Sequence, residues 1–430
     1  MYHDPEFSTL PQIKLHFATG KVNGYYDSQN PDLQNRASEL LAKAVDPYFD
    51  VLGKYAHLTF PVKRFKSHTK DLKQLIDYYD QILYNEQMLM GLMKYNRVFE
   101  NRMYFNVMYH SYMYSTSYHT GYHDDTLAEL CDDNRFKSVV WGPAHEVGHS
   151  NQTRPGLKWL GTTEVTNNIM SEYIQTTVFE QDSRLQVEDT GNKVASNRYS
   201  KAWNNIVVDK LAHSKEEDVF CKLVPFWQLE LFMGKVNGMT PLKQEDKGGF
   251  YPDVYEYVRN HDDLQTTGEQ QLEFVYIASL CAKMNLLDFF EQWGFLKPVD
   301  IEIEDYSKGK VVITQQQADE IRRRVETLGF PKPDMPIVYI SDNNYNVFAS
   351  KTPIEKGSAS RTGNILTMSD WKNVIVYEVR KDTPEGELVA VSEGVNKPST
   401  VASFEVRGGW KDNYKVYAVQ FDNKRIEVIF

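Results

Sequence analysis

Two histidines stand four residues apart in the segment WGPAHEVGHSNQ, residues 141–152, with a glutamate directly after the first. On a helix, positions i and i+4 lie on one face, so His145 and His149 can offer imidazole nitrogens to one metal ion while Glu146 points beside it. Imidazole suits zinc, and a catalytic zinc site has three protein ligands and one water. The spacing therefore predicts a zinc site that needs a third protein ligand.

A candidate for that third ligand stands fifteen residues after His149, in GTTEVTNNIMSEY, residues 161–173. We expect it to be Glu164, which opens a predicted helix after a loop through which the chain can fold back. Asn168 follows one helical turn later on the same face, so we predict that it orients the ligand. Glu172 is the competitor, but it lies about 12 Å further along a helix axis, too far to share the ion with Glu164.

The alternative interpretation is a surface helix whose histidines bind nothing. Gly148, inside the motif, argues against it, because glycine weakens a helix by about 1 kcal/mol and usually stands where another segment approaches closely. A glutamate at a suitable distance argues in the same direction.

A second histidine pair with the same spacing, His119 and His123, lies in YHTGYHDD, residues 118–125. Gly121 stands between them and the surroundings indicate strand or loop, so the same-face argument does not apply. We interpret this segment as a loop. Loops that border a site often carry binding residues, which makes His119 and Tyr122 candidates for contacting a substrate.

Composition limits the class of protein. At 430 residues the chain is long enough for two or three domains, and 41% hydrophobic and 25% charged residues are typical of globular proteins. No stretch approaches the roughly 18 apolar residues that indicate a membrane span. The net charge of -11 opposes binding to a phosphate backbone, so we expect no nucleic-acid partner.

The cysteines and the first residues say little about the compartment. The three cysteines show no paired spacing, which indicates neither a disulfide framework nor a thiolate zinc site. The first residues, MYHDPEFSTLPQ, lack the basic and apolar regions of a secretory signal.

The pattern of apolar and polar residues changes twice along the chain. Residues 12–27 predict short strands, and helical patterns dominate residues 137–329, the last helix opening with a capping box at Thr314 and ending at Gly329. After Pro331 the chain alternates apolar and polar residues, as in NVIVYEVR and YKVYAVQF. That alternation is typical of a β-sandwich.

At WGPAHEVGHSNQ followed by GTTEVTNN, the chain resembles the enhancin-like, mucin-targeting peptidases, a zinc family within the gluzincins whose third ligand is a glutamate. Other segments resemble that family as well, and together they cover most of residues 12–330. These segments are FATGKVNGYYD (17–27), DVLGKYAHLTFPVKRF (50–65), PFWQLELF (225–232) and LLDFFEQWGF (286–295).

The resemblance implies an α+β fold. We expect a mainly helical gluzincin-type catalytic domain with a small sheet at residues 66–335. A β-containing part at residues 1–65 precedes it, and an immunoglobulin-like β-sandwich at residues 336–430 follows. The sandwich is predicted to act as a spacer or as a carbohydrate-binding unit.

The resemblance also implies a function: a secreted or bacterial cell-surface protease that acts on O-glycosylated, mucin-type proteins. It makes His145, His149 and Glu164 the zinc ligands and Glu146 the catalytic base. No glycan-binding motif can be matched position by position. Trp159, between the two metal-binding segments, is a candidate for stacking on a sugar, although core packing is the favoured alternative for a tryptophan.

The resulting hypothesis is a zinc endopeptidase in which Glu146 takes a proton from the zinc-bound water and returns it to the leaving amine. A second donor for the oxyanion is expected, a tyrosine or histidine outside the motif. Two alternatives stay open: a zinc protease of broader specificity, and a non-catalytic adhesin that binds mucin glycans. The oligomeric state is not indicated.

Overall fold

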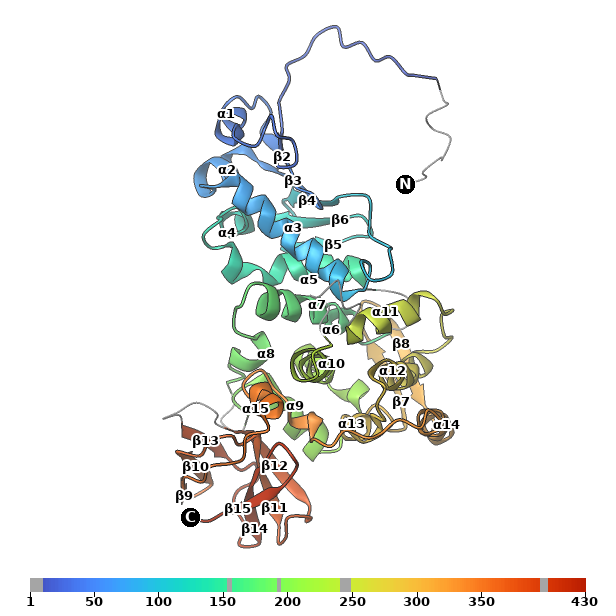
Figure 1. The fold of residues 1–430 in the computed structure, drawn as a ribbon, viewed down its shortest axis with the longest axis vertical. Coiled ribbons are helices and arrows are strands. Elements are labelled where there is room, and N and C mark those ends of the chain that lie inside the picture. The colour runs from blue at the N-terminus through green and yellow to red at the C-terminus, as the bar shows by residue number, and fades with distance from the viewer. Residues whose placement is uncertain (1–10, 153–156, 192–194, 240–248, 395–400) are drawn as a thin grey trace.

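The computed structural model describes residues 11–152, 157–191, 195–239, 249–394 and 401–430. Three tiers follow one another along the long axis of the molecule: a sheet with helices at the N-terminal end, a helical middle tier, and antiparallel sheets at the C-terminal end (Figure 1). The fold is thus mixed α/β with a C-terminal β-sandwich, as the sequence predicted.

The first tier is built on a six-stranded sheet of order β1-β2-β3-β4-β6-β5. Its strands are β1 (Tyr26–Asp27), β2 (Tyr48–Leu52), β3 (Ala56–Pro61), β4 (Met103–Met108), β5 (Met113–Ser115) and β6 (His119–His123). Its helices are α1 (Ala37–Ala42), α2 (Val62–His68), α3 (Leu72–Leu89) and α4 (Leu127–Leu130). The strands therefore extend well beyond residue 65, and the predicted domain boundaries at 65 and 335 stay predictions.

Residues His119–His123, within the segment interpreted as a loop, instead form strand β6, so that prediction is wrong for them. β6 pairs in parallel with β4 and antiparallel with the edge strand β5. Thr120 and Tyr122 are fully buried on it. Gly121 is needed there, because an added Cβ would lie 2.3 Å from the ring of Tyr114.

The middle tier is helical, as expected for residues 137–329. Its helices are α5 (Trp141–Asn151), α6 (Thr163–Thr166), α7 (Asn168–Tyr173), α8 (Arg184–Val187), α9 (Arg198–Ala202), α10 (Val219–Glu230), α11 (Phe250–Arg259), α12 (Thr267–Ala282), α13 (Leu287–Gln292) and α14 (Gln315–Thr327). The capping box of Thr314 with Gln317 is present at the start of α14. One hairpin interrupts the helices, β7 (Val299–Glu304) with β8 (Lys308–Ile313), which the sequence analysis missed.

The C-terminal tier follows α15 (Tyr345–Ser350) and contains a three-stranded and a four-stranded antiparallel sheet with a core of their own. The strands are β9 (Ser358–Thr362), β10 (Ile365–Ser369), β11 (Val376–Lys381), β12 (Leu388–Glu393), β13 (Val401–Glu405), β14 (Tyr414–Val419) and β15 (Arg425–Val428). Val376, Val391 and Val419 pack instead into the large core of the first two tiers. The sandwich is therefore docked on the helices.

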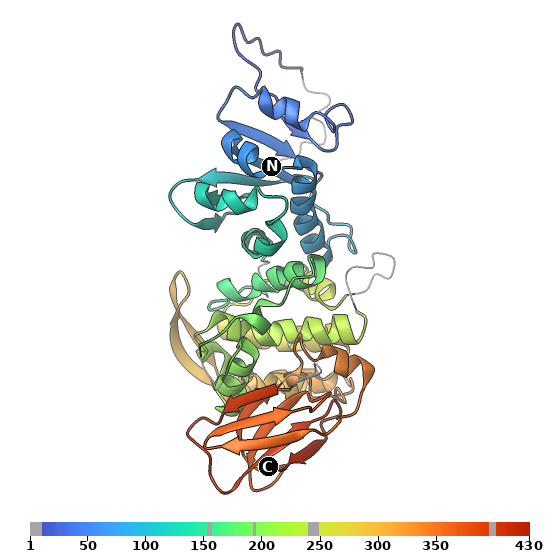
Figure 2. The same ribbon diagram turned by 90° about the vertical axis from the view of Figure 1, so that its left-hand side faces the viewer.

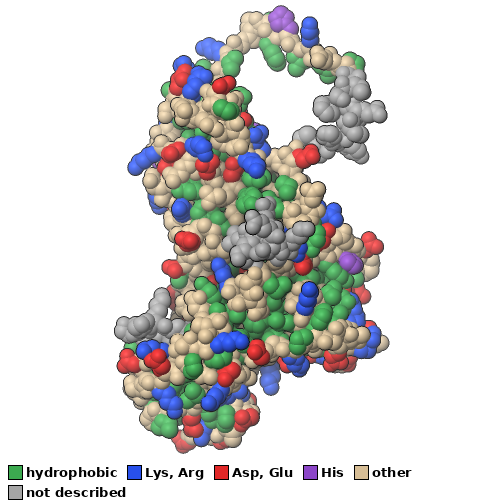
Figure 3. Space-filling model, in the orientation of Figure 1, with side chains coloured by type: hydrophobic (Ala, Val, Ile, Leu, Met, Phe, Trp, Pro, Cys, Tyr) green, Lys and Arg blue, Asp and Glu red, His purple; other side chains and the backbone are tan. Residues whose placement is uncertain are grey.

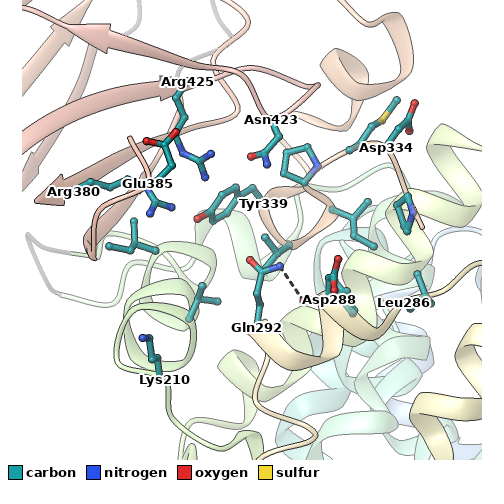
Figure 4. Close-up of a pocket in the computed structure, with 18 of the residues that line it drawn as sticks. Lys210, Leu286, Asp288, Gln292, Asp334, Tyr339, Arg380, Glu385, Asn423 and Arg425 are labelled. Atoms are coloured by element: carbon teal, nitrogen blue, oxygen red, sulfur yellow. Dashed lines mark hydrogen bonds between the residues drawn. The ribbon is translucent and has the colours of Figure 1, made fainter. Parts of the chain in front are cut away.

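A polar cavity of about 510 Å³ lies at this junction (Figure 4). Figure 4 shows Arg380 and Arg425 on the sheet side of it. Both guanidinium groups bind the fully buried carboxylate of Glu378, which also accepts a 2.7 Å hydrogen bond from the hydroxyl of Tyr339. The hydrogen bonds from Arg380 and Arg425 hold the pKa of Glu378 below its usual value although burial raises it.

The visible surface mixes charges of both signs, and hydrophobic side chains gather over the helical middle tier (Figure 3). Across the described ranges, no helix combines the length and the apolar character needed to cross a bilayer.

Replacing Glu378 with alanine should destabilise the protein, because two partly buried guanidinium groups lose their counter-charge. We expect the free energy of unfolding to fall by about 3–5 kcal/mol in urea denaturation. Glu427→Ala is the control: its carboxylate pairs with Lys415 at 3.1 Å on the surface, and its loss should cost less than about 1 kcal/mol. Equal effects of the two variants would contradict the structural role of Glu378.

Candidate metal centre

Helix α5 presents the two histidines of the motif on one face. Ala144, Val147 and Gly148 of this helix are buried against the core, while His145 and His149 keep 21% and 15% of their side chains exposed. The two imidazole rings lie with centroids 4.6 Å apart and planes nearly perpendicular. One helical turn therefore separates two ring nitrogens that approach the same point.

The third predicted ligand completes the group. Glu164 Oε2 lies 3.1 Å from His145 Nε2 and 3.4 Å from His149 Nε2, and the two Nε2 atoms are 3.1 Å apart. Ligand atoms about 2.0–2.1 Å from a tetrahedral zinc ion are separated by about 3.3 Å, so these three atoms fit such an ion. Within the described residues no fourth Asp, Glu, His or Cys joins the group, which matches a catalytic rather than a closed structural site.

Glu164 reaches this position because the helix that carries it is broken. Its backbone torsions, φ -93° and ψ 19°, are not helical, and short α6 is followed by α7 rather than by one continuous helix. Asp305 Oδ2 accepts hydrogen bonds from the backbone N–H groups of Gly161 (2.7 Å) and Thr163 (3.2 Å), which holds the start of α6. Glu172, the competitor, is fully buried on α7 and lies outside the group of three.

The close approach of α5 to the segment between α6 and α7 explains Gly148. A Cβ at this position would lie 2.6 Å from the backbone oxygen of Asn167. Any larger residue would push the histidines away from Glu164.

Two amide side chains orient the histidines. Asn168 Oδ1 lies 2.7 Å from His145 Nδ1, and its Nδ2 donates to the backbone oxygen of Glu164 at 2.8 Å. With the proton on Nδ1, His145 directs the lone pair of Nε2 toward the centre of the group. Gln152 Oε1 lies 3.3 Å from His149 Nδ1, and its Nε2 donates to the oxygen of Thr163 at 3.0 Å. Gln152 was not predicted as a site residue, although it ends the motif segment three residues after His149.

The side chains around the metal group shift the pKa values of its two glutamates. Burial raises the pKa of Glu164, but hydrogen bonds from His145, His149 and Tyr306 outweigh it and hold that pKa well below its usual range. Burial raises the pKa of Glu146, whose residue is only 6% exposed, and the neighbouring histidines oppose that shift. Glu146 is thus a poorly solvated carboxyl beside the group, as a general base should be.

Tyr306 is a further residue of the site that the sequence analysis did not identify. It stands at the tip of the β7–β8 hairpin with a left-handed backbone (φ 59°), and its hydroxyl donates to Glu164 Oε1 at 2.5 Å. That hydrogen bond is the main cause that raises the pKa of Tyr306 to about 12. The alternation IEIE…KVVI around DYSKG was a hairpin signal that could have located it.

The predicted substrate-contacting residues lie in different surroundings. Trp159 is 4% exposed and packs against Phe226 and Phe274, so the prediction that it stacks on a sugar is wrong and the core alternative holds. Tyr122 is fully buried against Phe105, so its predicted contact with a substrate is also wrong. Both rings fill the core because strand β6 directs the side chain of Tyr122 inward and the segment before α6 does the same for Trp159. His119 is half-buried on β6 and stays a prediction.

Comparison with known proteins identifies the family. The profile of peptidase M60, enhancin and enhancin-like, matches residues 38–294, more than half of the chain and including the whole group of three ligands. The chain belongs to this family. The family resemblance noted from the motif is thus confirmed.

Relatives include human TRPM8 channel-associated factor 2, 31% identical over 194 residues, which are 44% of this chain and 19% of the relative. The homologous factor of Xenopus laevis is 26% identical over 188 residues, 41% of this chain and 18% of the relative. The chain thus spans about a fifth of the length of these curated relatives.

Solved structures share the fold over nearly the whole chain. A metallopeptidase from Bacteroides thetaiotaomicron matches with a TM-score of 0.75 at 24% identity, covering 96% of this chain and 71% of the other. A metallopeptidase in complex with Tn antigen has the same TM-score and identity and covers 96% and 78%. The M60 catalytic domain of Clostridium perfringens ZmpC, in complex with the sialyl T antigen, matches with a TM-score of 0.60 at 19% identity over 92% and 72%.

Replacing Asn168 with alanine should weaken metal binding without unfolding the protein, because His145 loses the acceptor that fixes its tautomer. We expect the zinc affinity to fall by about 10- to 100-fold in calorimetric titration. Ser171→Ala, which removes only a 3.2 Å donor to Asn168, should change it by less than the Asn168 substitution. An unchanged affinity in Asn168→Ala would show that this amide does not orient the ligand.

Proposed function

We propose that this protein is a zinc-dependent endopeptidase that hydrolyses peptide bonds in O-glycosylated, mucin-type proteins. The observation that carries the proposal is the convergence of His145, His149 and Glu164 within 4.8 Å beside the buried carboxyl of Glu146. A binding module has no need of a glutamate at that position. Membership of the M60 peptidase family supports the same chemistry.

The glycoprotein substrate is supported by the structural neighbours. One of them is in complex with Tn antigen and another with the sialyl T antigen. We extend glycan recognition to this chain as part of the proposal. A secreted or bacterial cell-surface location belongs to the proposal as well.

Each residue has a role that its position permits. When bound, zinc would polarise the scissile carbonyl and acidify a water molecule. Glu146 accepts the proton of the attacking water and delivers it to the leaving amine, a transfer that its poor solvation favours. When substrate is bound, the hydroxyl of Tyr306 would redirect its one proton from Glu164 Oε1 to the oxygen that becomes negatively charged in the transition state.

Replacing Glu146 with alanine should abolish hydrolysis while zinc stays bound, because the base is lost and the three ligands remain. The test maps, by mass spectrometry, the products from an O-glycosylated mucin fragment and from its unglycosylated twin. We expect wild type to cleave only the glycosylated chain and the variant to cleave neither.

Other outcomes separate the alternatives. Cleavage of both substrates by wild type would keep the zinc chemistry and remove the mucin specificity. A metal-free protein that binds the fragment without cleaving it would support the adhesin. Retained turnover in Glu146→Ala would overturn the assignment of the base.

Replacing Tyr306 with phenylalanine should lower kcat by about 10²- to 10³-fold, because one oxyanion donor is lost. The KM should change little, since the hydroxyl acts on the substrate mainly in the transition state. Because Glu164 also loses a hydrogen bond in this variant, kcat is compared at saturating zinc. Ser307→Ala at the same hairpin tip is the matched control and should retain wild-type kcat. An equal loss in both variants would indicate that the hairpin, rather than the hydroxyl, matters.

A further inference from the structure

A cavity of about 630 Å³ adjoins the metal group on the side of Glu164. Three segments form its walls: Gly161 with Glu164, the stretch from Leu211 to Lys222, and the end of strand β7 from Ile301 to Glu304 with the following Asp305. We name it the β7 groove. Figure 2 shows the β7–β8 hairpin at the left-hand side of the molecule, beside the helices of the middle tier.

The groove runs along the edge of β7 rather than across one face of the hairpin. Side chains of a strand alternate between two faces, yet all five successive residues from Ile301 to Asp305 line the groove, and no residue of β8 does. β7 pairs with β8 alone in a two-stranded sheet of the described chain. Its other edge therefore presents unpaired backbone N–H and C=O groups to the groove.

The hairpin is fixed in place, so this edge is preformed. Ile303 faces the body of the protein, since a Cβ on Gly161 would lie 2.7 Å from its Cδ1. Asp305 is tied to the backbone of Gly161 and Thr163, and Tyr306 to Glu164. A chain lying along β7 would consequently arrive at the metal group.

The groove is anionic. Beyond the ligand Glu164, five carboxylates line it, from Glu216, Glu217, Glu302, Glu304 and Asp305, against the two amines of Lys215 and Lys222. Lys222 is largely buried, and burial lowers its pKa. Glu302 and Glu304 are exposed and form no ion pair among the described residues, although Lys310 and Lys308 stand opposite them on β8. Anionic groups entering the groove would therefore meet an excess of like charge.

We propose that the β7 groove binds the substrate on one side of the scissile bond as an extended strand paired with the free edge of β7, and that its carboxylates select against acidic or sialylated residues there. The inference rests on the proposed peptidase function and deepens it. Backbone pairing supplies affinity without demanding a particular sequence, while the charge supplies selectivity.

The first test examines strand pairing through binding to Glu146→Ala, so that turnover is not needed. Fluorescently labelled glycopeptides carry a single N-methyl group, moved one residue at a time along each flank. Alternate backbone amides of a paired strand face the partner, so we expect the affinity in fluorescence anisotropy to fall by about 3- to 10-fold at every second position of one flank. Losses without a period of two on either flank would overturn the paired strand.

The second test examines charge. Wild type should cleave glycopeptides with an acidic or sialylated residue in the groove-side flank more slowly than neutral ones, and the preference should weaken with salt. The double substitution Glu302→Lys with Glu304→Lys should relieve that penalty by roughly fivefold or more. Glu320→Lys with Glu326→Lys on α14, which changes net charge equally outside the groove, should leave it unchanged.

Failure of the proposed peptidase function and failure of the groove assignment give different results. If wild type cleaves no glycopeptide at all, the proposed peptidase function fails. If wild type cleaves them and the charge preference is absent, or is the same in both double variants, the selectivity assigned to the β7 groove is wrong.

Discussion

The contact between Gly148 and the backbone of Asn167 is the constraint on which the rest of the site depends. Only a residue without a Cβ lets α5 approach the junction of α6 and α7 this closely. That approach brings two imidazole nitrogens from one helix within 3.1–3.4 Å of a carboxylate oxygen from another segment. This packing therefore brings three donor atoms to the separation that a zinc ion needs. The amides of Asn168 and Gln152 then set the orientation of the two imidazole rings.

A second constraint on the position of Glu164 comes from residues far from the metal motif in the sequence. The hairpin tip at Asp305 and Tyr306 lies about 140 residues beyond Glu164, yet it holds both the backbone ahead of Glu164 and its carboxylate. The same hairpin carries the free edge of β7. Metal binding, transition-state stabilisation and substrate selection would thus be linked through one short element whose residues are not adjacent to the metal motif.

The C-terminal sandwich is joined to the helices by more than its linker. Valines of β11, β12 and β14 pack into the main core, and Asn204 of the helical tier exchanges hydrogen bonds with the backbone of Val391. Glu378 joins this interface to Tyr339, which precedes the sandwich. The sandwich is therefore packed and hydrogen-bonded against the helical tier rather than attached only by a linker.

The local part of the site can be predicted from the amino-acid sequence. The spacing of His145 and His149 places both rings on one face of any helix, and the identity of the helical tier and the β-sandwich follows from periodicity that local sequence carries. Which distant residues contact the two histidines and their ligand partner depends on the folded chain as a whole. Tyr306 and Asp305 come from a hairpin, Trp159 and Tyr122 turn into the core, and Glu164 sits at a break in its helix. The physical reason is that long-range packing and the hydrogen bonds of an irregular backbone depend on the whole fold, whereas helical and strand periodicity depend on neighbours along the chain.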